Sequence, residues 1–276
     1  MRVLVTGATG FVGGAVLRRI AEDASLVHAA ARVHVMRDGA ADPLTEFRLV
    51  NVEGTLHLAR EAARAGVRRF VFLSSIKVNG ERTDPDRPFT ASDEAAPADS
   101  YGISKHEAER GLRALAVQTG MEVVIIRPVL VYGPSVKGNF RSMIGWLQKG
   151  VPLPLGAIRN KRSLVALDNL VDLIMVCLRH PAAANQTFLV SDGDDLSTTE
   201  LLRGVSAAMN KKARLLPVPQ SVIEMLARVV GKSDIAQRLC GNLQVDIRKT
   251  RELLGWSPPV AVGTALARAT SVSKTR

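Results

Sequence analysis

The sequence predicts an α/β protein built on a parallel sheet, and three observations favour this fold class. Apolar runs rich in β-branched residues alternate with segments of helical periodicity as far as residue 128, as in right-handed βαβ units. Residues 3–14 combine a strand pattern, a glycine-rich turn and the start of a helix. From residue 197 onward, helical patterns and prolines continue without a clear βαβ unit, which predicts a smaller, mostly helical second domain.

The composition is that of an ordinary globular protein. The chain has 276 residues, of which 46% are hydrophobic, so it can bury a substantial core. Cys177 and Cys240 lie far apart without metal-ligand spacing, which predicts buried free thiols, a cytoplasmic location and no metal site. The first strand opens the chain, so we expect no signal peptide. The apolar run 170–178 is interrupted by Asp172 and is too short to span a membrane.

The formal net charge of +11 raises the question of nucleic-acid binding. The lysines and arginines are scattered over the predicted helices, without a basic block and without interleaved aromatic residues. We therefore expect no nucleic-acid partner. A basic balance also suits an enzyme that handles phosphate-rich ligands.

The glycine-rich turn carries the first functional signal. Gly7, Gly10 and Gly13 have the spacing G-x-x-G-x-x-G between a strand and a helix. Such a turn is tight, lacks a Cβ where a pyrophosphate approaches, and lets the helix pack closely on the strand. The helix N-terminus then offers N–H groups to an anion. A glycine-rich turn without a ligand is the alternative, but the strand and helix on either side favour dinucleotide binding.

The next elements are predicted in order along the chain. Residues 25–31 form a strand and 32–43 a loop. A helix over 50–65 is capped by Gly66, and residues 67–75 return as a strand that ends in hydroxyl side chains.

The remaining elements include one unusually long loop. Residues 80–99 contain three prolines, and loops of this length in compact domains are usually functional. The predicted elements that follow are a helix from 99–100 to Gly120, a strand at 122–128, a helix around 140–149, a strand at 163–168, a helix through Cys177 and a strand at 188–190.

Tyr101 and Lys105 form a candidate catalytic pair. They are four residues apart on one predicted helix, so their side chains share a face. A phenol with a pKa near 10 is a poor catalyst at neutral pH, but a nearby ammonium favours the phenolate. Ser75 ends a parallel strand, where ligands bind in such sheets, and its hydroxyl can hold a substrate oxygen. The structural alternative is that Tyr101 covers a helix start while Lys105 is solvated.

Together these motifs resemble the short-chain dehydrogenase/reductase superfamily. Their order is similar to its extended branch, the nucleotide-sugar epimerases, dehydratases and reductases. The segments that carry the resemblance are the glycine loop, Ser74-Ser75, Tyr101-Gly102-Ile103-Ser104-Lys105, His28-Ala29-Ala30, Asn51-Val52-Glu53-Gly54-Thr55, residues 127–134, Arg162-Ser163-Leu164-Val165, Asp168 and Leu253 with Gly255-Trp256.

The resemblance implies a Rossmann-type doubly wound sheet, NAD or NADP as cofactor, and a role for each matching residue. Ser75, Tyr101 and Lys105 would be the catalytic residues. The implied cofactor-binding residues are Gly7, Thr9, Gly10, Phe11, Val12, Gly13, Ala29, Ala30, Asn51, Tyr101, Lys105, Arg127 and Pro128. The implied substrate-binding residues are Ser75, Lys77, Asn139, Lys161 and Arg162. The resemblance also implies a homodimer formed by the helices around residues 51–65 and 100–119.

Two domains follow from this assignment. Residues 1–134 would form the NAD(P)-binding domain, to which residues 163–190 return. Residues 135–162 and 191–276 would form the domain that binds the nucleotide sugar.

Three functions are compatible with the sequence. Asn79 stands where the commoner family pattern has an aromatic residue, and its surroundings resemble a subgroup from bacterial surface-polysaccharide pathways. That resemblance implies reduction of a UDP-4-keto-6-deoxy-N-acetylhexosamine at C4. The alternative is a UDP-hexose 4-epimerase with tightly held NAD, because both reactions share hydride transfer at C4. A non-catalytic NAD(P)-binding regulator is the third, although such proteins usually lose the tyrosine or the lysine.

One part of the expected fold has no counterpart in the sequence. The alanine-rich strand 25–31 matches the fourth strand of the family, so the second strand, its helix and the third strand are missing. A right-handed connection straight to the fourth strand would place the opening helix on the opposite face of the sheet. We therefore predict that residues near Glu22 and Ala24 are not adjacent in the natural protein, and that the absent segment holds the residue selecting NAD or NADP. A normal Cα–Cα distance of about 3.8 Å at each step would contradict this.

Overall fold

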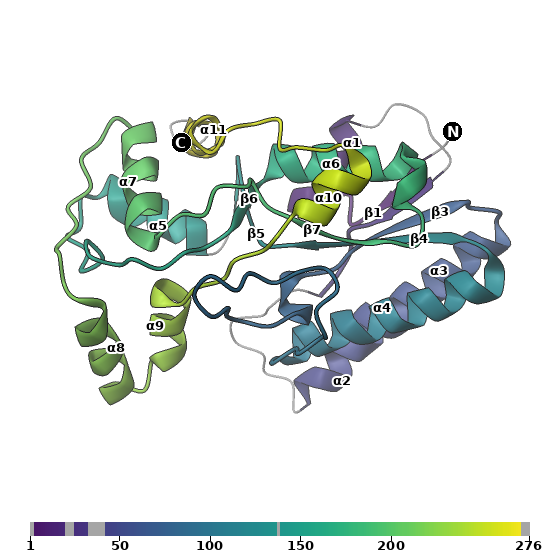
Figure 1. The fold of residues 1–276 in the computed structure, drawn as a ribbon, viewed down its shortest axis with the longest axis horizontal. Coiled ribbons are helices and arrows are strands. Elements are labelled where there is room, and N and C mark those ends of the chain that lie inside the picture. Colours follow the sequence, from purple (N-terminus) through teal and green to yellow (C-terminus); the bar gives the residue numbers. More distant parts are fainter. Residues whose placement is uncertain (1–2, 20–24, 33–41, 137–138, 272–276) are drawn as a thin grey trace.

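A computed structural model describes residues 3–19, 25–32, 42–136 and 139–271 (Figure 1). Its centre is a five-stranded parallel sheet, which confirms the predicted α/β class. The strand order is β1-β2-β3-β4-β7, with β1 at Val3–Thr6, β2 at Ser25–His28, β3 at Arg69–Leu73, β4 at Glu122–Pro128 and β7 at Thr187–Val190.

Helices cover both faces of this sheet. Helices α1 (Phe11–Arg19) and α6 (Leu167–Arg179) share one core with Val71 and Val124. Helices α3 (Gly54–Arg64) and α4 (Ser100–Thr119) share another with Phe70, on the opposite face. Because neighbouring residues of a strand point to opposite faces, β3 and β4 read as continuous apolar runs that are buried on both sides.

The ends of α4 are set by local chemistry, as the sequence predicts. The Asp99 carboxylate accepts a hydrogen bond from the Gly102 N–H at 2.7 Å, and Gly120 ends the helix with φ 73°. The start of the preceding helical segment differs from the prediction. Helix α2 begins at Pro43 and continues through a π-helical turn, Leu49–Glu53, into α3. The proline marks the first turn of the helix rather than the end of a loop, because its missing N–H is not needed there.

A second core lies beside the main one. Strands β5 (Leu130–Tyr132) and β6 (Leu164–Ala166) pair in parallel, and the core around Tyr132, Phe140 and Leu202 is built with helices from both halves of the chain. The remaining helices are α5 (Asn139–Gln148), α7 (Thr198–Ala208), α8 (Gln220–Val229), α9 (Ser233–Cys240), α10 (Arg248–Leu254) and α11 (Val262–Ser271). The segment 243–256 packs into the main core through Leu243, Leu254 and Trp256, and the predicted domain division stays a prediction.

The connection between β1 and β2 departs from the predicted right-handed topology. The chain advances across the sheet in the same direction from β1 to β2 and from β2 to β3, while α1 and α3 lie on opposite faces. The two connections therefore have opposite hands, and right-handed connections are the strong rule. Among the described residues no helix covers Leu4 on β1, which is 57% exposed. The predicted break near Glu22 and Ala24 lies outside the described residues and stays a prediction.

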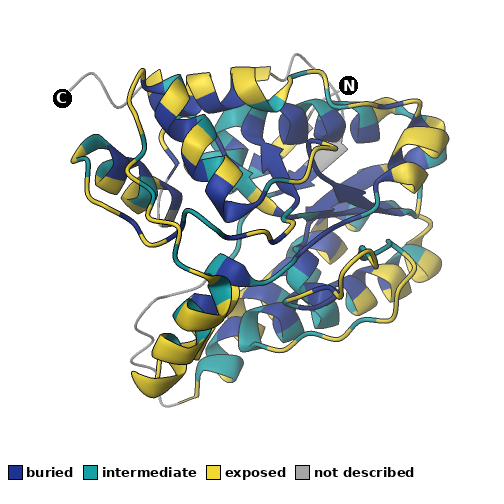
Figure 2. Cartoon of the chain, turned by 60° about the vertical axis from the view of Figure 1, so that its left-hand side comes forward, coloured by how far each residue is buried: buried dark blue, intermediate teal, exposed yellow. Residues whose placement is uncertain are grey.

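The two cysteines are buried free thiols, as predicted, and burial raises the pKa of both. Figure 2 shows how burial follows the layers, with the strands buried and the outer faces of the helices exposed. Within the described part of the chain, no helix is long and apolar enough to cross a membrane.

Candidate active site

The glycine loop between β1 and α1 is as tight as its sequence predicts. Gly7 has φ 72°, and the Gly10 N–H donates to the Gly7 carbonyl oxygen at 2.8 Å. A Cβ added to Gly13 would lie 2.2 Å from that same oxygen, so the first turn of α1 packs directly on the loop. The loop therefore presents backbone at the N-terminus of α1, which is the cradle that a dinucleotide pyrophosphate requires.

The chain that follows β2 lies against this loop. A Cβ on Gly7 would lie 2.7 Å from the Ala30 nitrogen, so the predicted cofactor residues of the two segments do meet. Asn51 holds the backbone of Arg32, two residues after Ala30, in place. Its side-chain oxygen accepts from the Arg32 N–H at 2.8 Å, and its amide donates to the Arg32 carbonyl oxygen and to Ser104 Oγ, both at 3.0 Å. Asn51 thus joins the segment after β2, which carries the predicted cofactor residues, to α4.

The three predicted catalytic side chains come together where β3 ends and α4 begins. Ser75 begins the short 3₁₀ turn Ile76–Val78, and its hydroxyl accepts from the Lys77 N–H at 3.3 Å. The Ser75 side chain acts on the Tyr101 hydroxyl by lowering its pKa, so the two hydroxyls lie near each other. The Lys105 Nζ lies 6.0 Å from the centre of the Tyr101 ring, one helical turn farther along.

The electrostatics of the pair differ from the sequence interpretation. Lys105 is 2% exposed, and its Nζ donates to the Leu73 carbonyl oxygen at 2.7 Å and lies 4.4 Å from the centre of the Phe72 ring. Burial lowers the pKa of Lys105 to about 7. Burial, followed by the charge of Asp99, raises the pKa of Tyr101 to about 12. The Ser75 side chain has the opposite, smaller effect of lowering this pKa. Desolvation therefore dominates the pKa of Tyr101, and the phenol is protonated at neutral pH.

His28 completes this site, and the sequence interpretation assigned it no chemical role. Its ring hydrogen-bonds Thr6 on one side and Thr55 on the other, and it stacks on Phe72 with the ring centres 5.8 Å apart. Burial, followed by the charge of Lys105, lowers the pKa of His28 to about 4, so the ring is neutral at physiological pH. The sequence feature that could have pointed to His28 is its place at the end of a strand, directly before the small residues Ala29 and Ala30.

A buried ion pair lies directly behind the catalytic residues. Glu109 and Arg127 form hydrogen bonds of 2.6 and 2.9 Å, and Ser74 Oγ donates to the same carboxylate at 2.6 Å. Glu109 is fully buried and Arg127 is 3% exposed. The resemblance implies a cofactor role for Arg127, which stays a prediction; its guanidinium is bound to Glu109 and Asn79. It therefore supports the site from within the core, one residue before Pro128 at the end of β4.

Asn79, which departs from the common family pattern, has a structural role. Its side-chain oxygen accepts from Arg127 Nη1 at 2.9 Å, and its amide donates to the Thr90 carbonyl oxygen at 2.9 Å. The long loop is also held through Phe89, which exchanges backbone hydrogen bonds with Gln244 and Asp246. Asn79 therefore anchors the long loop 80–99 to the ion pair behind the catalytic residues.

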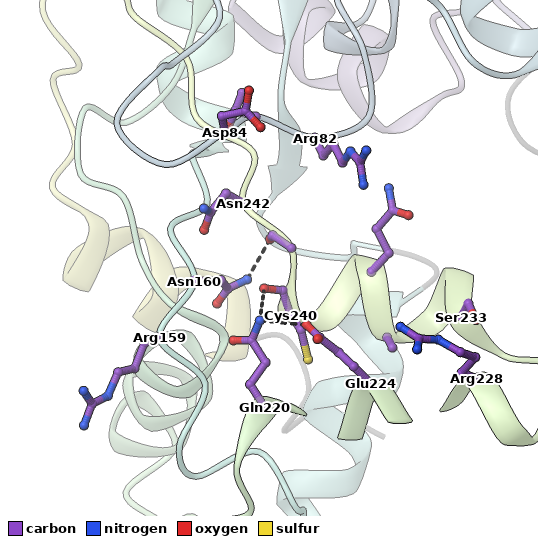
Figure 3. Close-up of a pocket in the computed structure, with 14 residues that line it drawn as sticks. Arg82, Asp84, Arg159, Asn160, Gln220, Glu224, Arg228, Ser233, Cys240 and Asn242 are labelled. Atoms are coloured by element: carbon purple, nitrogen blue, oxygen red, sulfur yellow. Dashed lines mark hydrogen bonds between the residues drawn. The ribbon is translucent and has the colours of Figure 1, made fainter. Parts of the chain in front are cut away.

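A polar cavity of about 640 Å³ opens between this loop, the connector that holds Arg159 and Asn160, and helices α8 and α9 (Figure 3). Three arginines line it, namely Arg82, Arg159 and Arg228, together with the carboxylates of Asp84 and Glu224. No sequence motif marked this cavity, because its residues come from three parts of the chain that are far apart, namely residues 82–84, 159–160 and 220–242.

Comparison with known proteins gives the family. The NAD dependent epimerase/dehydratase family matches residues 23–191. A UDP-glucose 4-epimerase from Vibrio cholerae is 56% identical over 235 residues, which cover 85% of this chain and 72% of the relative. This chain belongs to the NAD dependent epimerase/dehydratase family. Its members are enzymes, so the non-catalytic regulator is no longer a candidate.

Two further comparisons agree with this family. A UDP-glucose 4-epimerase from Mycolicibacterium smegmatis is 25% identical, with 97% of both chains covered, in an alignment of 326 positions. Because this chain has 276 residues, at least 50 of those positions hold residues of the relative without a counterpart here. The structure of RMD from Pseudomonas aeruginosa complexed with NADPH shares the fold, with a TM-score of 0.81 and 18% identity over the whole of both chains.

The residues that the family resemblance assigns to the substrate lie in different surroundings. The Lys77 ammonium is paired with Asp99 and with Glu81, the latter at 2.9 Å. Lys161 pairs with Asp86 at 3.1 Å on the surface. Arg162 donates to the Gly241 carbonyl oxygen at 3.1 Å, and burial lowers its pKa. Asn139 begins α5, and its side chain lies outside the described part of the structure.

The remaining residues assigned to the cofactor cluster at the start of α1. Thr9 is exposed, while Phe11 and Val12 are half-buried against the main core. Their assignments, like those of the substrate residues, stay predictions.

We expect the substitution Gly13→Ala to abolish cofactor binding. The new Cβ would lie 2.2 Å from the Gly7 oxygen, a contact that real side chains do not make, so the helix must move off the loop. Fluorescence titration with NADH measures the affinity. The matched control is Gly54→Ala, also at a helical glycine, where the nearest atom would be 3.7 Å away. Equal cofactor affinity in the two variants would contradict the assignment of the loop.

Proposed function

We propose that this protein is a UDP-sugar 4-epimerase that uses tightly held NAD. The observation that carries the proposal is its 56% identity to a UDP-glucose 4-epimerase, combined with the meeting of Ser75, Tyr101 and Lys105 in one site. This places the epimerase ahead of the reductase that the sequence favoured.

The residues present suit this chemistry. Bound nicotinamide supplies the acceptor and donor of the hydride at C4 of the sugar. Tyr101 moves the proton of the C4 hydroxyl, and Ser75 holds the oxygen toward it. To favour the phenolate, the Lys105 ammonium must lie closer to Tyr101 than its hydrogen bond to the Leu73 carbonyl oxygen allows. His28 beside it is neutral, so it adds no second positive charge that would repel this ammonium.

A second candidate is reduction of a 4-keto sugar at C4. One observation favours it, namely that Asn79 stands where the commoner family pattern has an aromatic residue, in surroundings that resemble the reductase subgroup. In this reaction Tyr101 would donate its proton to the oxygen that forms when the ketone is reduced.

The test is incubation with UDP-glucose without added cofactor, followed by analysis of the sugar product and the nicotinamide absorbance. We expect UDP-galactose to form with no net change in absorbance, because an epimerase returns the hydride to the same sugar. The control is Tyr101→Phe, which should form UDP-galactose far more slowly than the wild type. Stoichiometric NADH or NADPH consumption with a 4-keto sugar, without interconversion of the hexoses, would establish the reductase instead.

The substrate's diphosphate fits the polar cavity. A guanidinium group can bind two phosphate oxygens at once, and Arg82, Arg159 and Arg228 line this cavity. Lys161 and Arg162 follow directly after Asn160, which lines it. A homodimer through helices α3 and α4 and a cytoplasmic location remain predictions.

We also infer that a segment is absent between α1 and β2. The opposite hands of the first two connections and the at least 50 unmatched positions of the mycobacterial relative support this. The residue that selects NAD or NADP would then lie in the absent segment.

A further inference from the structure

Helix α8 carries an apolar stripe on its solvent side. Five residues have the spacing i, i+3, i+4, i+7, i+8, which is one face of a helix, and all are exposed. They are Val222, Met225, Leu226, Val229 and Val230, and Val229 is 79% exposed. Ile235 at the start of α9 extends the stripe. We call these six residues the α8 stripe.

The opposite side of the same helix is polar and faces inward. Gln220, Glu224 and Arg228 recur every fourth residue and line the cavity. Ile223 of α8 packs against the second core, whereas the apolar residues of the stripe remain exposed. An exposed apolar stripe bordered by polar residues is typical of a surface that contacts a partner or a membrane.

Cationic residues precede and follow the α8 stripe along the chain. Lys211, Lys212 and Arg214 precede α8, while Lys232 and Arg238 follow it, and all five are exposed. Residues 211–240 contain six cationic residues and the two carboxylates Glu224 and Asp234. Apolar side chains flanked by lysine and arginine are the combination that inserts between the headgroups of anionic lipids.

We propose that the α8–α9 hairpin docks this enzyme on an anionic membrane surface. The hairpin lies at the far end of the molecule from β1 and β3, so it can reach a flat surface (Figure 1). A symmetric dimer through the same stripe would bring its lysines and arginines against those of the second copy, which is unfavourable. Docking places the arginine-lined cavity, which shares α8, next to the lipid headgroups. This goes beyond the proposed function, because it does not depend on which C4 reaction the enzyme performs.

The test is flotation of the full chain with lipid vesicles. We expect binding to vesicles of phosphatidylcholine mixed with phosphatidylglycerol, no binding to phosphatidylcholine alone, and release at high salt. The double variant Leu226→Glu, Val229→Glu should bind at least roughly tenfold more weakly, because it places two anions in the stripe. The control is Val151→Glu, at a 41% exposed position after α5 and away from α8, which should bind normally.

The enzymatic readout keeps this proposal separate from the proposed function. Both variants should convert a soluble UDP-sugar at the wild-type rate, since neither changes a residue of the site. Absence of wild-type binding to anionic vesicles would overturn the proposal, as would equal binding by the stripe variant. A stripe variant that changes from dimer to monomer in light scattering, with no vesicle binding by the wild type, would show instead that a second copy covers the stripe.

Discussion

Tyr101→Phe should lower turnover by about a hundredfold to ten-thousandfold, the range expected when a general acid–base group is removed. The substitution deletes one hydroxyl and leaves the ring, which packs edge-on against Phe47 with the ring centres 6.1 Å apart. The cofactor pocket should therefore keep its shape, and NADH affinity should stay nearly unchanged. Lys105→Ala should weaken both turnover and cofactor affinity, because the family resemblance places Lys105 on the cofactor as well.

The matched control for Tyr101→Phe is the same change at the chain's other tyrosine. Tyr132 is buried in the second core, and its hydroxyl donates to Asp192 at 2.7 Å. Tyr132→Phe should cost about 1–2 kcal/mol of folding free energy and leave turnover intact. Near-normal turnover by Tyr101→Phe on the true substrate would refute the assigned mechanism.

Glu109→Gln should destabilise the protein by about 3–5 kcal/mol, because it leaves the buried charge of Arg127 without its partner. The pKa of Glu109 is lowered chiefly by its hydrogen bond and charge interaction with Arg127, against the opposing effect of burial. The Glu109 carboxylate is therefore ionised in the folded protein. Urea unfolding of the purified variant measures the loss.

The control for this prediction lies on the same helix. Glu107 pairs with Arg48 at 2.6 Å, but both side chains are partly exposed. Glu107→Gln should cost far less, because water replaces the lost partner of an exposed charge. Equal losses of stability in the two variants would mean that the buried pair contributes no more than a surface pair.

The sequence by itself determined the features that depend on local chemistry. The glycine loop, the Asp99 cap and the Gly120 terminus of α4 follow from backbone geometry that few residues can adopt. The parallel sheet followed from continuous apolar runs. The residues that the resemblance groups as catalytic, Ser75, Tyr101 and Lys105, lie near one another in the structure, and their roles stay predictions. Pro43 was misinterpreted because the same residue ends one kind of segment and begins another.

Only the tertiary structure decided how these residues are charged and what supports them. Lys105 lies against the Leu73 carbonyl and the Phe72 ring, so its low pKa depends on burial by a strand 32 residues away. The structural roles of Arg127 and Asn79 depend on hydrogen bonds, from Arg127 to Glu109 and Asn79 and from Asn79 to Thr90. No sequence motif links these residues. The cavity and the exposed stripe of α8 likewise exist through packing alone. Burial and long-range contacts are properties of the folded chain, so a linear pattern of residue types does not contain them.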